Sequence, residues 1–286
     1  MSSNQEDTAN LPIRCSLTLA YAVSLVIAAI MAIASVAGLL YGSIIYPTDE
    51  LLQSFVPNDV VNLFIGLPIL LGSIWLARRG KLVGLLFWPG ALFYVFYTYI
   101  VYVFSMPLNV AFVLHLALLT SSAYTMISLV ACIDGKAVQR LLTGTVPERA
   151  GGGVLAGLGI LFFLQVVGVM VNALISQTPV TAAELALHVS DFLIAPAWVI
   201  GGVLLWRRKA LGYVAGLGLL FQASMLFIGL IGILILRPFI TAAQFVLGDV
   251  LVVFVMGMVC FIPFALFVRG VVGRRHRDGV RAGGSS

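Results

Sequence analysis

The chain of 286 residues is 61% hydrophobic and only 9% charged, and its mean hydropathy is +1.11. Because soluble domains usually carry about 25% charged residues, this composition excludes a water-soluble globular fold. The net charge of +5 does not indicate a nucleic-acid-binding protein, since the basic residues stand in short clusters between apolar runs. We predict an all-α, polytopic transmembrane helical bundle in the inner (plasma) membrane, with the lipid bilayer as its partner and no nucleic acid.

Eight apolar runs are long enough to cross about 30 Å of hydrocarbon as helices. They span residues 17–46, 59–77, 82–105, 107–132, 153–176, 182–206, 210–236 and 242–269. The segment DELLQSF, before the second run, is amphipathic and is predicted to lie on the outer membrane surface. Thr181 and Thr241 each precede a Glu or Gln by three residues, a spacing that predicts capping boxes at the outer starts of helices six and eight.

The basic residues determine the predicted orientation. With both termini inside, every lysine and arginine except Arg237 falls on a cytoplasmic segment, as the positive-inside rule requires. The acidic residues expected outside are Asp49, Glu50, Asp59 and Glu184. The three cysteines are expected toward the reducing cytoplasmic side, so no structural disulfide is predicted among Cys15, Cys132 and Cys260.

The two halves of the chain resemble each other. Asn62 and Pro68 precede a pair of arginines, and Asp191 and Pro196 precede another, with Asn62 and Asp191 separated by 129 residues. Two parallel four-helix repeats would explain this pattern; chance similarity between apolar sequences is the alternative. The predicted organisation is a cytoplasmic tail at 1–16, a first repeat at 17–134, a cytoplasmic linker at 135–152, a second repeat at 153–270 and a basic cytoplasmic tail at 271–286.

Residues 66–80, GLPILLGSIWLARRG, and residues 86–94, LFWPGALFY, carry a family resemblance. They resemble a family of prokaryotic multi-pass membrane proteins to which no function is assigned. The resemblance covers the second to fourth helices, and more loosely the sixth and seventh. It implies a membrane topology and no catalytic residue.

Polar side chains inside a bilayer cost free energy, so those within the apolar runs are candidates for function. Asp191 is the strongest, because Pro196 follows it and is expected to break the helix; Asn62 and Pro68 form the matching pair. Most of these residues lie in the outer halves of their helices, which an outward-opening polar cavity or simple proximity to the interface would explain. The candidate binding residues are Asp191, Asn62, His115, Asp249 and His188.

The sequence contains little that indicates a cofactor. His115 and His188 have no metal-binding spacing, so no metal and no cofactor is predicted. No lysine lies deep in a helix, which excludes a retinal Schiff base. The tyrosines of the third helix are expected in an aromatic belt or in helix packing, with a ligand pocket as the alternative; they are Tyr94, Tyr97, Tyr99 and Tyr102.

Three functions remain open. The favoured one is a small transporter or permease-like protein with an outward-facing polar site for a small molecule or ion. The second is a non-catalytic membrane subunit, sensor or assembly factor, which would work with a membrane partner or as a homo-oligomer. The third is an intramembrane enzyme acting on a lipid or quinone, although the sequence leans against an enzyme.

Overall fold

The computed structural model describes residues 11–240 and 244–282. Within them, eight helices are long and apolar enough to cross a membrane. The chain is therefore a multi-pass integral membrane protein with an all-α fold, as the composition predicts. A bilayer core offers the backbone no hydrogen-bond partners, so each spanning segment must satisfy its own amides as a helix.

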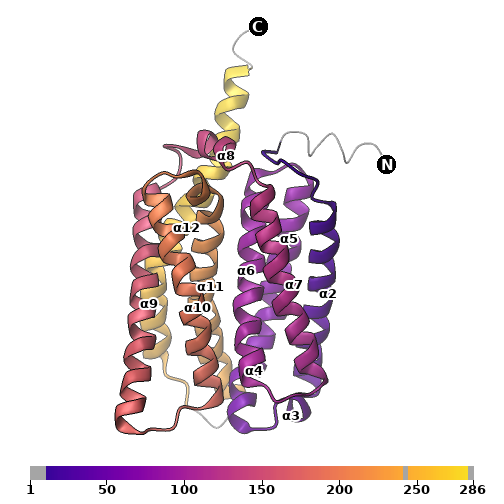
Figure 1. The fold of residues 1–286 in the computed structure, drawn as a ribbon, viewed down its shortest axis with the longest axis vertical. Coiled ribbons are helices and arrows are strands. Elements are labelled where there is room, and N and C mark those ends of the chain that lie inside the picture. Colours follow the sequence, from indigo (N-terminus) through magenta and orange to yellow (C-terminus); the bar gives the residue numbers. More distant parts are fainter. Residues whose placement is uncertain (1–10, 241–243, 283–286) are drawn as a thin grey trace.

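The helices stand in two side-by-side groups (Figure 1). The first group contains α2 (Thr18–Leu40), the short α3 (Gly42–Ile45), α4 (Asp49–Val61), the π-helical turn η2 (Asn62–Gly66), α5 (Leu67–Arg78), α6 (Leu82–Ser105) and α7 (Val110–Cys132). The second contains α9 (Glu148–Ser176), α10 (Ala182–Trp206), α11 (Ala210–Ile240) and α12 (Leu247–Ala282). The short α8 (Gly135–Leu142) joins the groups at the end of the molecule where the described chain begins, at residue 11, and ends, at Ala282.

The second membrane span begins earlier than expected. Asp49–Arg78 forms one continuous span made of α4, η2 and α5, so the prediction that residues 49–55 lie on the membrane surface is wrong. Leu51 and Phe55 are buried against the bundle. Pro57 lies inside α4; neighbouring helices make such a proline tolerable in a membrane.

Helix capping agrees with the sequence at one of the two predicted sites. The Thr181 hydroxyl accepts a hydrogen bond from the amide of Glu184, whose carboxylate accepts one from the Thr181 amide. The box predicted at Thr241 includes residues outside the described part of the chain, and α12 begins at Leu247. At the start of α7 the cap is Asn109, whose side chain accepts from the Phe112 amide.

The segment before α2 packs along the end of α7. Ile13 and Ile133 form an isolated antiparallel bridge, and an Arg14 guanidinium nitrogen lies 2.8 Å from an Asp134 carboxylate oxygen. The hydrogen bond from Arg14 lowers the pKa of Asp134 below its ordinary value. These contacts fix the N-terminal segment at the end of the molecule where α8 lies.

The same strand-like contact brings two cysteines together. The Arg14 amide donates to the Cys132 carbonyl, and the neighbouring Cys15 forms a disulfide with Cys132, with their Cα atoms 5.4 Å apart. The prediction of no disulfide is therefore wrong. It rested on compartment alone, whereas the pairing follows from a tertiary contact across 117 residues that no spacing rule reveals.

The arginine turns after α5 and α10 lie at the same end of the bundle. The Arg78 guanidinium stacks on Tyr21, near the start of α2, and the Gln139 amide of α8 donates to the Arg208 carbonyl. Residues 135–152, expected as a linker, form α8 and the first residues of α9, while α12 continues as a helix beyond its apolar part to Ala282.

Candidate functional site

The polar interior of the protein is organised around α6. This helix packs against α5 and α7 of its own group and α10 and α11 of the other. Its four tyrosines are all buried, so of the two expected placements, an aromatic belt or helix packing, they occupy the second. Because hydrocarbon cannot hydrogen-bond a phenol, three of these hydroxyls donate to polar side chains inside the protein, namely those of Tyr94, Tyr97 and Tyr102. The Tyr99 hydroxyl has no hydrogen-bond partner among the described residues.

Asp59 is the most completely coordinated acid in the membrane part. One of its carboxylate oxygens accepts a hydrogen bond from Tyr46 at 2.5 Å and the other accepts from Tyr102 at 2.9 Å. Asp59 as a whole is only 1% exposed. The prediction that Asp59 lies on an outer loop is wrong, because α4 extends the second span outward past this residue.

His115 of α7 borders this acid through Tyr102. The imidazole ring lies edge-on to the Tyr102 ring, with 4.7 Å between centroids. His115 is buried, and its Nδ1 has no hydrogen-bond partner within the described residues. A buried nitrogen without a hydrogen-bond partner costs folding free energy. In the polar cluster of Asp59, Tyr102 and His115, the His115 Nδ1 therefore remains free to form one more hydrogen bond.

Asp191 lies on α10, in the second helix group, and is hydrogen-bonded by a tyrosine of α6. The Tyr97 hydroxyl donates to an Asp191 carboxylate oxygen at 3.1 Å, which joins α6 to α10 across the two groups. One turn away, the Tyr94 hydroxyl donates to the Asn62 side-chain oxygen at 2.7 Å. The Asn62 side-chain nitrogen is buried and finds no partner in the described part of the chain.

The remaining two candidates are less involved. His188 precedes Asp191 by three residues and is half-buried, and its Nδ1 is unpaired among the residues described. Asp249 lies in the exposed first turn of α12, where a carboxylate is favoured by the positive end of the helix dipole. The structure therefore leaves Asp249 outside the polar interior.

The two prolines differ in what they do to their helices. A π-helical turn from Asn62 to Gly66 precedes Pro68, and such turns are frequent at functional positions. By contrast, α10 runs without interruption through Pro196 from Ala182 to Trp206, so the predicted break at Pro196 is not seen. The proline still removes one hydrogen bond from the helix.

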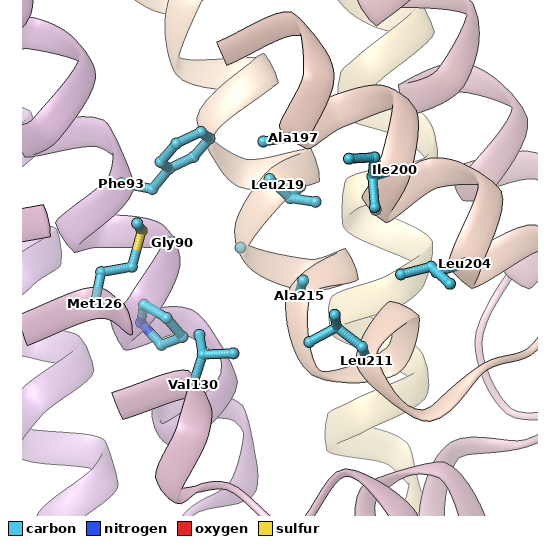
Figure 2. Close-up of a pocket in the computed structure, with 13 residues that line it drawn as sticks. Gly90, Phe93, Met126, Val130, Ala197, Ile200, Leu204, Leu211, Ala215 and Leu219 are labelled. Carbon is cyan, nitrogen blue, oxygen red and sulfur yellow. The ribbon is translucent and has the colours of Figure 1, made fainter. Parts of the chain in front are cut away.

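A pocket of about 230 Å³ lies between the two groups (Figure 2). Its lining residues come from α6, α7, α10 and α11 and are all apolar. None of the polar candidates lines it. Within residues 11–240 and 244–282, no group of three or more His, Cys, Asp or Glu side chains is arranged to hold a metal ion.

Comparisons with known proteins give no family assignment. No family model matches the chain, and neither a characterised protein nor a solved structure matches it significantly. The resemblance of residues 66–94 therefore stays a sequence observation, and function has to be argued from the geometry.

Asp59 is the site residue that sequence reasoning missed. A signal was present, because Asp59 lies three residues before Asn62, on the same helical face, and 129 residues before His188. Assigning Asp59 to the outer side of the membrane hid that register.

Proposed function

We propose that the protein is a small transporter in the plasma membrane, and that Asp59 and Asp191 bind a proton or a small cation during transport. The observation that carries the proposal is that both carboxyl groups are buried and that, within the described chain, neither forms an ion pair with a lysine or arginine. Tyrosine hydroxyls supply only neutral hydrogen bonds. The missing positive charge must then come from a bound proton or cation.

Burying two such acids for structure alone would be costly. An ionised carboxyl group inside a membrane costs several kcal/mol unless its charge is compensated, roughly 2.5–3.5 kcal/mol on insertion scales. Binding and releasing a proton or cation changes this cost, and so changes which packing of the surrounding helices is favoured. This is the coupling that a transporter requires.

The arrangement of the two groups supports the proposal. Gly90 of α6 and Gly218 of α11 contact each other backbone to backbone, and these positions are equivalent in the proposed repeats, at an offset of 128. Equivalent residues meet on a pseudo-two-fold axis, so α6 and α11 would form the central pair of two parallel four-helix repeats. Small residues at that crossing let the helices approach closely.

Flux measurements on the purified protein in proteoliposomes test the proposal. Vesicles containing a pH-sensitive dye would be given sodium, potassium or proton gradients, and we expect the wild type to move at least one of these ions. Asp59→Asn and Asp191→Asn should each reduce that flux at least tenfold. Asp249→Asn, which changes an exposed aspartate, is the matched control and should leave it unchanged.

Two results would contradict the proposal. Unchanged flux in both buried variants would remove these acids from the mechanism. Absence of any ion flux, together with a stoichiometric partner that copurifies under mild detergent, would favour a non-catalytic membrane subunit.

A further inference from the structure

The pocket between the helix groups is an open crevice and not a sealed cavity. Ile200 and Leu211 on its rim are 58% and 48% exposed, so it faces the surrounding membrane. Its inner wall includes Gly90 and Gly218, where α6 and α11 cross. Figure 2 shows Phe93 and Met126 approaching it from one group and Ala215 and Leu219 from the other.

The lining of the crevice is suited to a hydrocarbon occupant. On α10 it extends from Ala197 to Leu204, a rise of roughly 10 Å at 1.5 Å per residue. All of its lining residues are apolar, so an acyl chain can occupy it without burying a polar group.

Basic residues lie where the crevice reaches the membrane surface. Leu204 is three residues before Arg207, and Leu211 is two residues after Lys209. Both cations are exposed. On α10, Arg207 continues the row of lining residues by about one more turn. A chain in the crevice would therefore end beside positive charge.

Two carboxylates with described side chains lie at this end, and neither is paired with those cations. Asp134 is paired with Arg14. Glu148 accepts hydrogen bonds from the Gly144 amide and the Tyr213 hydroxyl. Among the described side chains, Arg207 and Lys209 form no ion pair, so an anionic group beside them would meet positive charge that these acids do not neutralise.

We propose that the crevice binds one acyl chain of an anionic phospholipid, with the headgroup beside Arg207 and Lys209. Protein interiors rarely keep voids larger than a water molecule, and an apolar groove open to a bilayer is filled by lipid. The anionic preference follows from the cations at its mouth. The site is separate from the Asp59 and Asp191 acids and does not depend on transport.

Native mass spectrometry of the full chain, delipidated in detergent, tests the site. Phosphatidylglycerol and phosphatidylcholine with identical acyl chains would be titrated separately, and we expect the first to bind about tenfold more tightly. Arg207→Gln combined with Lys209→Gln should abolish that preference. Arg149→Gln, an exposed cation at the same end, is the control and should retain it.

Filling the crevice tests the acyl-chain part separately. Ala197→Phe, or Ala215→Leu if the first variant does not fold, should reduce retention of both lipids at least fivefold. Ala265→Phe, on an exposed position of α12, should not. Unchanged binding in the folded crevice variants would overturn the proposal, as would a wild type that binds both lipids equally or that fills the crevice by dimerising.

Discussion

At the scale of single residues, the phenol groups of α6 decide how acids are accommodated in the membrane. Tyr97 and Tyr102 each donate to a buried aspartate, and Tyr94 donates to Asn62. A phenol combines a large apolar ring with one donor, so it fills space between helices and still satisfies a carboxylate. That explains why a helix so rich in tyrosine is buried instead of lying at the interface.

Removing one of these hydroxyls should destabilise the protein measurably. Tyr102→Phe keeps the ring but leaves an Asp59 oxygen without its donor, and we expect a loss of about 1–3 kcal/mol in the free energy of unfolding. Tyr124→Phe is the matched control, because that tyrosine is 74% exposed. Thermal unfolding in detergent would compare the two, and equal melting temperatures would show that the Asp59 bond contributes nothing.

At the scale of helices, close packing between α6 and α11 holds the two groups together. A Cβ atom on Gly90 would meet the Gly218 Cα, and both backbones are parts of rigid helices. Neither helix can shift locally to relieve such a contact, because each also packs against other helices of its group.

Adding a side-chain atom where α6 and α11 cross should therefore destabilise the protein. We expect Gly90→Ala to reduce the free energy of unfolding by about 1–3 kcal/mol through overpacking. Gly72→Ala is its control, since a Cβ atom there meets nothing within 4 Å and alanine favours the helix. A melting temperature for Gly90→Ala that matches the Gly72→Ala value would rule out the close crossing.

The N-terminal segment is attached to α7 by a covalent bond as well as by backbone contacts. Denatured protein that has been trapped without reductant should react with maleimide at one thiol, Cys260. After reduction it should react at three. A reducing cytoplasm opposes such a bond, so three reactive thiols without reduction would show that Cys15 and Cys132 stay unpaired in cells.

At the scale of the whole molecule, the basic turns, α8 and the C-terminal part of α12 lie at one end (Figure 1). The positive-inside rule predicts that this end faces the cytoplasm. On that prediction, Arg207 and Lys209, beside the crevice, would lie in the leaflet where anionic lipids are enriched.

Labelling at the two ends of α9 tests that orientation. In a variant without native cysteines, Thr178→Cys should react with an impermeant maleimide on intact cells. Ala150→Cys, at the opposite end of the helix, should react only after permeabilisation. The reverse pattern would place the basic end outside and invalidate the assignment.

The sequence alone determined the eight spans, the all-α class and the common end of the basic turns. Those features follow from local chemistry, because a segment that crosses hydrocarbon must be a long apolar helix. The capping box at Thr181 is likewise formed by residues only three positions apart. Asn62, His115 and Asp191 could also be selected in advance, since a polar residue in an apolar run is visible without a structure.

Only the tertiary structure decided which of these residues meet and what encloses them. The burial of Asp59 by Tyr46 and Tyr102, the Cys15–Cys132 bond and the apolar crevice all join segments far apart in the chain. Periodicity and composition describe one helix at a time. Contacts between helices depend on how their surfaces fit, and in a membrane that fit comes from packing and hydrogen bonding instead of a local apolar signal.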